Sequence, residues 1–444
     1  MLARDQRRSC EGTDVGRAMV SLRRFPYPYK AALAICSDID ETRTTAEFLE
    51  IQRFLNTKDV TSMGEGVGLE IGNSIYFYDS EGRFSYFTHD ERAKGVIIDL
   101  IRAGYVDCLH SYGDAAASRD DILRALDVLH AADCKLDVWI NHHGAPSCLG
   151  RKFEYMFGEC RGDDPSSNVY HADVTLDYGI RFVWIGAVSR IVGQSCTSGL
   201  LSSLSSVFDW QHPLGSSINV SKETRKKVLG KSGDERYMIH QQNQLTRVVQ
   251  LEDRQRVHEF MRYCNHPVSV SRGATSRGLS CAISRRALEH LRAREGFMIV
   301  YTHLGKNGDC RQVVAPETQA ALRNLEREYR DGQIYVTTTS KLLIYHHACR
   351  YLAWSHQQTR GCLQIRVDHI EDPAFGSITP TIADLQGLTF YVPDRSKAEI
   401  YVRGVKVKSI QRNPADDSGM ESVMFPLTYL RPPALAGMFP GTTY

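Results

Sequence analysis

The chain has 444 residues and a mass of 50.1 kDa, and its 42% hydrophobic and 24% charged residues are typical of a globular protein rather than of a disordered or fibrous one. Its 54 Lys and Arg residues nearly balance its 52 Asp and Glu residues, so the formal net charge is only +2. This balance gives no global field that would attract a polyanion, and we expect no nucleic-acid partner.

The cysteines and the amino-terminal segment indicate in which cellular compartment the protein is found. Twelve cysteines are scattered between Cys10 and Cys362 without a CxxC pair, whereas disulfide frameworks are typical of short secreted chains. The basic first residues lack the apolar stretch of a signal peptide, and no run of about 18 apolar residues is present. We therefore expect reduced thiols, no transmembrane segment and a cytoplasmic location.

The order of the predicted elements favours an α/β fold. Residues 1–24 carry six Arg and no strand pattern, and we interpret them as a flexible N-terminal arm. From residue 25 onward, strand-like apolar runs alternate with helical runs, a pattern that predicts parallel βα units closed into a barrel over residues 25–356. The seven predicted strands are 31–37, 106–110, 136–141, 180–185, 266–270, 297–303 and 333–338.

Three helix starts and three other segments complete the predicted organisation. Ser118 with Asp121, Ser284, and Pro316 each satisfy or remove an unpaired amide at the beginning of a helix. We predict a β-hairpin in 64–88 and an insertion loop over 190–245. Short alternating strands separated by Pro, Gly and Asp then predict a small β-sandwich domain over residues 357–444.

Chemically active side chains gather at the carboxyl ends of the predicted strands. In parallel barrels the reactive groups come from this rim, where the βα loops converge. Four of the seven predicted strands end with His or with paired Asp. These ends read SDIDE (37–41), HSYGD (110–114), NHHG (141–144) and THLG (302–305).

The spacing of these residues is typical of a metal-dependent hydrolase. Asp38 and Asp40 point the same way if the strand stays extended, and a cation or a shared proton would relieve their repulsion. His110 and Asp114 could hold a divalent metal together with Asp40, and this metal would acidify a bound water. Asp38 would then accept the proton of the water, and His303 would protonate a leaving amine. A structural alternative is that the two aspartates only cap the following helix, and that His110 is a hydrogen-bonded core residue.

The same segments resemble a known family. AICSDIDE (34–41), LHSYGD (109–114), WINHHG (139–144) and MIVYTHLG (298–305), in this order, resemble the polysaccharide deacetylases of the nodulation-protein-B homology superfamily, carbohydrate esterase family four. The resemblance covers roughly residues 25–355. It implies a distorted (β/α)7 TIM-like barrel in which Asp38 is the catalytic base, Asp40 and His110 are metal ligands and His303 is the catalytic acid. The implied reaction is metal-dependent hydrolysis of an N-acetyl group.

Two motifs depart from the family pattern. The second family motif usually ends in His, whereas this chain has Asp114, an oxygen ligand that shifts preference from Zn²⁺ toward Co²⁺, Ni²⁺, Mn²⁺ or Fe²⁺. The third family motif usually carries an Arg that steadies the base, but the corresponding segment here has no Arg. Its His142 and His143 could line the substrate pocket or join the metal shell, and the spacing leaves both roles open.

The sequence therefore predicts a carbohydrate N-deacetylase that acts on an N-acetylated sugar or a polysaccharide precursor. We expect this enzyme to use a divalent metal ion, and Zn²⁺ is the ion we expect first. A catalytically inactive carbohydrate-binding or scaffold protein in surface-polysaccharide synthesis is the alternative, favoured by the two departures. A glycosidase is disfavoured, because two aspartates two residues apart lie closer than the roughly 5–9 Å that such enzymes use. The sugar, the oligomeric state and the role of the C-terminal domain stay open.

Overall fold

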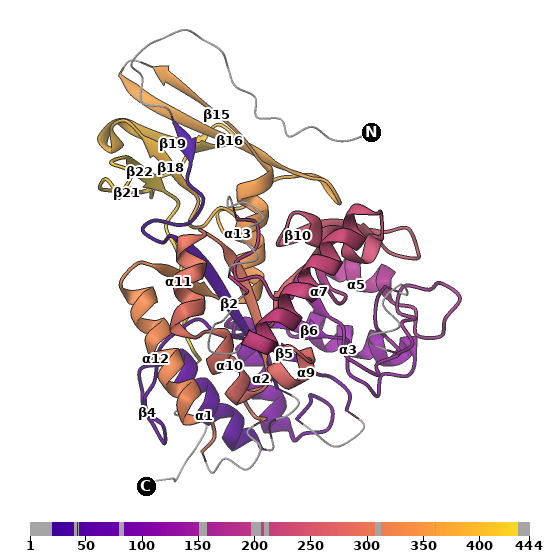
Figure 1. The fold of residues 1–444 in the computed structure, drawn as a ribbon. Helices are drawn as coiled ribbons and strands as arrows, with labels where there is room; N and C mark the ends of the chain where they lie inside the picture. Colours follow the sequence, from indigo (N-terminus) through magenta and orange to yellow (C-terminus); the bar gives the residue numbers. More distant parts are fainter. Residues whose placement is uncertain are drawn as a thin grey trace.

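A strongly curled sheet with helices packed around it forms the larger part of the protein in a computed structural model, and two smaller sheets lie at one end (Figure 1). The chain is thus mixed α/β with a barrel-like main sheet, in agreement with the predicted class. The structure describes residues 20–39, 42, 44–79, 84–150, 158–196, 206–207, 213–306, 312–359 and 361–433.

The curled sheet is parallel except at one edge. β2 lies at its centre and pairs with β13 along one side and with β14 and β5 along the other. β10 and β11 form the single antiparallel pair among its described strands. In spatial order the strands are β10 (Thr246–Gln250), β11 (Arg256–Phe260), β8 (Phe182–Trp184), β7 (Val138–Ile140), β6 (Val106–His110), β5 (Gly72–Ile75), β2 (Ala31–Asp38), β13 (Phe297–Thr302), β12 (Arg262–Tyr263) and β9 (Val188–Ser189), with β14 (Ile334–Thr337) beside β2.

The helices begin where the sequence places capping chemistry. Ser118 accepts a hydrogen bond from the backbone N–H of Asp121, Ser284 accepts one from Ala287, and Pro316 opens its helix, so all three predicted starts are confirmed. No helix among the described residues combines the length and the apolar character that a membrane crossing needs. The helices are α1 (Thr45–Asn56), α2 (Glu91–Arg102), α3 (Arg119–Ala131), α5 (Ala172–Tyr178), α7 (Pro213–Lys231), α8 (Met238–Gln241), α9 (Val270–Gly273), α10 (Ser276–Ala282), α11 (Arg285–Ala293), α12 (Pro316–Arg330) and α13 (Thr339–Tyr351).

The segment between 190 and 270 differs from the prediction. The expected strand 266–270 is wrong: Val268 is 60% exposed, and Ser269 caps the short helix α9 instead. The strands of this region are β10, β11 and β12, which come earlier in the chain. The predicted insertion loop 190–245 contains the nineteen-residue helix α7, whose polar sequence gives little amphipathic signal.

The segment 64–88 differs as well. It contributes the buried strand β5 to the main sheet, and a separate small hairpin joins β3 (Val60–Thr61) to β4 (Gly64–Glu65). The sequence of β5 shows no apolar run, because two of its four side chains are polar and are buried with hydrogen-bond partners. Asn73 pairs with Gln52 and donates to the Tyr105 carbonyl. The backbone N–H groups of Tyr86 and Phe87 donate to the carbonyls of Tyr76 and Phe77, a constant offset of ten residues instead of the converging register of a hairpin. The described residues of 76–88 form no strand, and residues 80–83 of the predicted hairpin lie outside the described residues.

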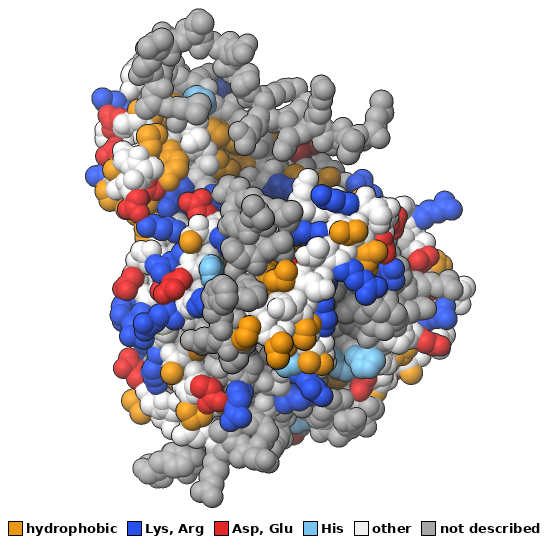
Figure 2. Space-filling model, in the orientation of Figure 1, with side chains coloured by type: hydrophobic (Ala, Val, Ile, Leu, Met, Phe, Trp, Pro, Cys, Tyr) orange, Lys and Arg blue, Asp and Glu red, His pale blue; other side chains and the backbone are white. Residues whose placement is uncertain are grey.

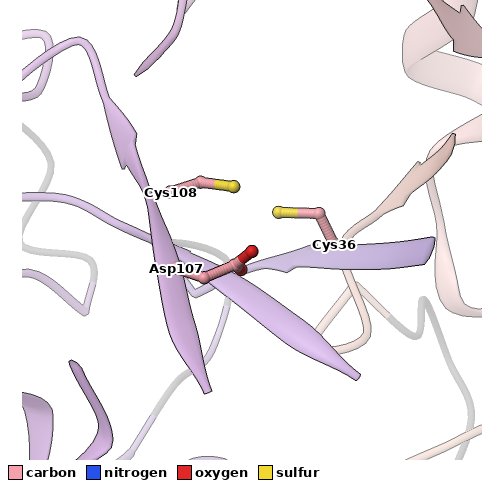
Figure 3. A group of neighbouring side chains, drawn as sticks. All are labelled: Cys36, Asp107 and Cys108. Atoms are coloured by element: carbon pink, nitrogen blue, oxygen red, sulfur yellow. The ribbon is translucent and has the colours of Figure 1, made fainter. Parts of the chain in front are cut away.

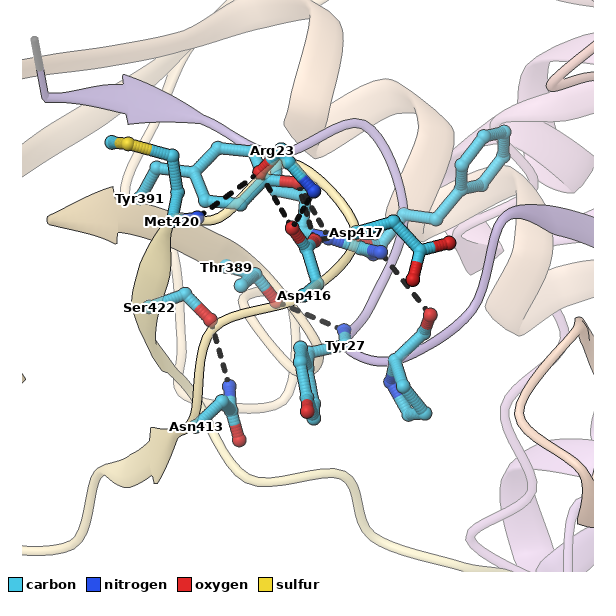
Figure 4. Close-up of polar contacts among 12 residues, drawn as sticks. Arg23, Tyr27, Thr389, Tyr391, Asn413, Asp416, Asp417, Met420 and Ser422 are labelled. Atoms are coloured by element: carbon cyan, nitrogen blue, oxygen red, sulfur yellow. Dashed lines mark hydrogen bonds and ion pairs between the residues drawn. The ribbon is translucent and has the colours of Figure 1, made fainter.

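Two smaller sheets form the C-terminal part, and β15 begins directly after α13 at Leu352. Of the predicted arm, Ser21 and Leu22 form strand β1, which pairs with β18, while residues 1–19 lie outside the described residues. Arg23, which follows β1, contacts Asp416 and Tyr391 of the C-terminal part (Figure 4). The first sheet comprises β15 (Leu352–Thr359), β16 (Cys362–Asp372), β17 (Gly376–Ile378), β19 (Ala398–Val402) and β20 (Val405–Lys406), and the second β1 (Ser21–Leu22), β18 (Thr389–Val392), β22 (Glu421–Met424) and β21 (Gln411–Asn413).

A buried histidine makes the stability of the fold sensitive to acid. The Nε2 atom of His171 lies 2.8 Å from the Ser147 carbonyl and its Nδ1 lies 2.8 Å from the Thr175 hydroxyl. Burial lowers the pKa of His171 to about 4, below the unfolded value of about 6.5. The stability from this residue is therefore complete above pH 6.5 and is lost as the pH falls toward 4.

We expect that lowering the pH from 7.5 to 5 removes about 2 kcal/mol of unfolding free energy through His171 alone. Urea unfolding of the wild type and of His171→Gln at both pH values measures this contribution. Glutamine keeps a donor for the Ser147 carbonyl but does not titrate, so the variant should lose about 2 kcal/mol less than the wild type on acidification. Equal losses in the two proteins would contradict the assignment.

Candidate functional site

The candidate site surrounds Asp38, the last residue of β2. All eight residues of β2 are buried, and the side chain of Asp38 has no exposed area. Its Oδ1 accepts a hydrogen bond from the Ser74 hydroxyl at 3.0 Å, and its Oδ2 accepts one from the Tyr301 hydroxyl. β5 supplies Ser74 and β13 supplies Tyr301, so the two strands that flank the end of β2 both hold this carboxylate.

Two imidazoles approach the same carboxylate oxygen. Nδ1 of His110, at the end of β6, lies 2.7 Å from Oδ2 of Asp38, and Nε2 of His303, directly after β13, lies 3.5 Å from it. The side chain of His110 is 2% exposed and that of His303 is 15% exposed, so His303 is the more accessible of the two. The structure thus brings together three of the predicted site residues, from sequence positions up to 265 apart.

These contacts set the charge of the group. Burial alone raises the pKa of Asp38, but the imidazoles of His110 and His303 outweigh it and hold the pKa of this carboxyl well below its ordinary value. Nδ1 of His303 lies 2.7 Å from the Ala274 carbonyl oxygen, which can only accept, so this nitrogen carries the proton. Nε2 of His303 is left to face Asp38.

The chain turns sharply after His110. Ser111 and Tyr112 both have left-handed backbone angles, with φ of 42° and 55°, and Gly113 follows with φ of 106°. A side chain at Gly113 would lie 1.7 Å from the Tyr78 carbonyl oxygen, so only glycine fits. Two consecutive non-glycine residues in this conformation store strain beside the site, as functional sites often do.

The two adjacent histidines of the third motif follow β7, in the turn after Ile140, and they differ in exposure. His142 is half-buried, its Nδ1 lies 2.7 Å from the Tyr76 hydroxyl, and its ring packs 4.9 Å from that of His110. His143 is exposed. His142 therefore belongs to the site, while His143 faces solvent.

Of the three predicted metal ligands, the structure describes His110 and Asp114. Asp40 lies outside the described residues. Asp114 is half-buried and follows the left-handed turn, and its role as a ligand stays a prediction. Among the described residues, Nδ1 of His110 is buried without an aligned hydrogen-bond partner, although it lies close to Asp38.

Arg262 is a site residue that the sequence analysis missed. The guanidinium carbon of this buried Arg lies 3.1 Å from the Trp184 ring centroid and 4.0 Å from that of Tyr301, the residue that donates to Asp38. Burial lowers the pKa of Arg262 to about 10, while Tyr301 and Asp38 act in the opposite direction. Its Nε and Nη1 atoms have no hydrogen-bond partner among the described residues. A single Arg between Met261 and Tyr263 has no spacing that marks it as a site residue.

Replacing Arg262 by Lys should destabilise the protein by about 2 kcal/mol. Lysine keeps the charge but loses the flat stacking between two rings, and a desolvated cation–π contact contributes about 2 kcal/mol or more. Denaturant unfolding measures the change. Arg181→Lys, which removes a partly exposed stack on Phe182, is the matched control and should cost less than about 1 kcal/mol. Equal losses of stability in the two variants would show that the stacking of Arg262 between Trp184 and Tyr301 contributes no additional stability.

The described residues contain two groups that could hold a metal ion. One comprises Cys36, Asp107 and Cys108, all buried, with the two thiols pointing toward each other between β2 and β6 (Figure 3). Burial raises the pKa of both thiols, which favours the protonated form that does not bind a metal. The other comprises His258, His347 and Asp372.

Comparison of the chain with protein-family models gives no match, and comparison with curated proteins gives none either. The resemblance to polysaccharide deacetylases therefore rests on the four sequence motifs alone.

Proposed function

We propose that the protein is a metal-dependent hydrolase that removes the N-acetyl group from an amino sugar or a polysaccharide precursor, with its reaction centre at Asp38. The observation that carries this proposal is the convergence of the His110 and His303 imidazoles on one oxygen of Asp38 at the end of a parallel strand. Reactive groups in barrel-like α/β enzymes gather at this end of the sheet. We further infer that the curled sheet is a distorted (β/α)7 barrel and that the two C-terminal sheets form a β-sandwich.

His303 is the residue that we propose to transfer the proton. Its Nδ1 is held by the Ala274 carbonyl, so a second proton would be carried on Nε2, the atom that faces Asp38. The carboxylate would stabilise the resulting imidazolium, as the aspartate of a catalytic triad does. His303 could then protonate the leaving amine.

Asp38 would act in the reaction mainly through its neighbours. The sequence predicts Asp38 as the base that takes a proton from water, but the carboxylate has no exposed area, and both of its oxygens already have partners. This environment favours a carboxylate that orients the two imidazoles and compensates their charge. A direct proton transfer to Asp38 would need one of these contacts to open.

The donor atoms fit a divalent cation. Nδ1 of His110 lies 2.7 Å from Asp38, so His110 would bind a cation through Nε2, with the carboxylate orienting the ring as it does for many metal-bound histidines. Imidazole nitrogen with carboxylate oxygen suits Zn²⁺ and its first-row neighbours. Asp40, His110 and Asp114 would hold this cation. Such a cation supplies an acidified water and polarises a carbonyl oxygen.

The surface and the thiols support the proposed substrate and location. On the face shown in Figure 2, basic and acidic side chains are interspersed, which suits a sugar substrate better than a polyanion. Every described cysteine has a free thiol, in keeping with the cytoplasmic location that we propose.

The test is acetate release from a panel of N-acetylated sugar nucleotides and oligosaccharides, with and without a chelator. We expect release with at least one substrate, loss of release on chelation, and recovery when Zn²⁺ or Co²⁺ is added back. His303→Gln should lower the rate by about 10²-fold or more. Binding of these sugars without acetate release would instead indicate a carbohydrate-binding or scaffold protein, and a new reducing end would indicate a glycosidase.

A further inference from the structure

A cluster of three buried residues lies away from Asp38, where the C-terminal part meets the curled sheet. His258 belongs to β11, His347 belongs to α13, and Asp372 is the last residue of β16. Their side chains are at most 5% exposed. α13 contacts both β2 and β16, so the cluster joins three elements that come from different parts of the chain (Figure 1).

The donor atoms of this cluster are close together. Nε2 of His258 lies 2.9 Å from Oδ1 of Asp372, and Nε2 of His347 lies 2.9 Å from Oδ2. Zinc binds nitrogen and oxygen ligands at about 2.0–2.2 Å, and tetrahedral geometry then places neighbouring ligand atoms about 3.3–3.6 Å apart. The observed separations of 2.9 Å therefore need to widen by about half an ångström to receive a small divalent cation.

Two further observations distinguish this cluster from an ordinary group of buried hydrogen bonds. Nε2 of His347 has no aligned hydrogen-bond partner among the described residues, despite its closeness to Asp372. Two backbone hydrogen bonds orient the carboxylate of Asp372. Its Oδ1 accepts the N–H of Ala374 at 2.6 Å and the N–H of Phe375 at 3.1 Å. Carboxylates that bind metals are commonly oriented by such additional hydrogen bonds.

The surroundings are apolar and aromatic. The ring of Phe182 lies 5.6 Å from that of His258 and 5.9 Å from that of His347, and Tyr351 packs 5.0 Å from His347. Nε2 of His347 is 2.9 Å from Asp372 without the alignment of a good hydrogen bond, and poorly aligned hydrogen bonds are weak. A cation bound between the three side chains would replace this contact by direct ligation.

We propose that His258, His347 and Asp372 bind a structural divalent transition-metal ion, Zn²⁺ by preference, which fastens the C-terminal sheets to the curled sheet. Two imidazoles and one carboxylate are a ligand set typical of zinc, and a water can complete the coordination. This site is separate in its residues from the proposed reaction centre, and it does not depend on the deacetylase activity.

The test uses the full-length protein carrying His110→Gln, which impairs the proposed reaction centre. After treatment with a chelator, this protein is titrated with Zn²⁺ and with Co²⁺, and its melting temperature is recorded with and without Zn²⁺. We expect one tightly bound equivalent, a higher melting temperature with Zn²⁺, and visible ligand-field absorption of Co²⁺ without a thiolate charge-transfer band. The last point excludes the Cys36 and Cys108 thiols as the ligands.

His347→Gln and His346→Gln in the same background form a matched pair. His346 is the neighbouring buried histidine of α13, and it faces Ser195 and Thr246 instead of the cluster. His347→Gln should weaken Zn²⁺ binding by at least about 100-fold, since even outer-shell changes cost about 10- to 100-fold. His346→Gln should bind as the parent does.

Retention of the equivalent in a folded His347→Gln protein would overturn the proposal. If this variant does not fold, Asp372→Asn replaces it, with the same two outcomes. The His110→Gln protein without any further change also tests the proposal. If it takes up neither Zn²⁺ nor Co²⁺, the three residues form a hydrogen-bonded cluster only. None of these measurements depends on acetate release. The metal-binding test therefore remains valid even if the protein is not a deacetylase.

Discussion

Asp38→Asn should lower the rate of acetate release about a thousandfold while leaving the protein folded. The amide oxygen can still accept the hydrogen bond from Ser74, and the amide NH2 can donate to the Tyr301 hydroxyl that bonded Oδ2, so the packing at the end of β2 is preserved. It carries no charge, however, and cannot stabilise a protonated His303. Losses of about 10²–10⁴-fold are usual when acid–base catalysis fails, and a thousandfold loss corresponds to about 4 kcal/mol of transition-state free energy.

The control is another fully buried aspartate. Asp163 accepts hydrogen bonds from the backbone N–H groups of Gly150 and Glu252, both at 3.0 Å. Asp163→Asn removes a buried charge in the same way, but we expect a rate within about threefold of the wild type. Circular dichroism and a melting curve verify that both variants are folded. If Asp38→Asn kept more than a tenth of the wild-type rate, Asp38 would not be at the reaction centre.

The parts of the fold that sequence analysis could predict are those whose pattern is local. β2 and β13 contain continuous apolar runs, and β6 (VDCLH) is apolar at three of its five positions. The capped starts of α3, α11 and α12 depend on residues within one helical turn. β5 could not be found, because Asn73 and Ser74 are buried by partners that come from distant segments. Strand β12 has only two residues, too few for any periodicity.

The candidate site divides in the same way. Asp38, His110 and His303 could be predicted because each follows a recognisable strand, and the ends of parallel strands meet at one edge of the sheet. Tyr301 and Arg262 could not be predicted, because an aromatic or basic residue inside a strand has no distinctive spacing. Only the fold shows that Arg262 stacks between Trp184 and Tyr301.

Arg23→Met should lower the free energy of unfolding by about 3–5 kcal/mol. Arg23 falls within the predicted arm 1–24, yet it is 8% exposed. Its Nη1 donates to the carbonyls of Phe25, Pro26 and Tyr29 at 2.7–3.0 Å. Its Nε lies 3.1 Å from Asp416 (Figure 4). Methionine fills a similar volume but leaves a mostly buried carboxylate and three carbonyls without this donor, and a broken buried ion pair costs about this much.

The neighbouring pair of Lys30 and Asp417 is the matched control. It also links the amino-terminal segment to the C-terminal part, but its side chains are 42% and 82% exposed. Lys30→Met should therefore cost less than about 1 kcal/mol, because exposed ion pairs contribute little. Urea unfolding of both variants measures the difference. Similar small losses would mean that the contacts of Arg23 contribute little to stability. A large loss confined to Arg23→Met would show that this residue joins the segment before β2 to the C-terminal part.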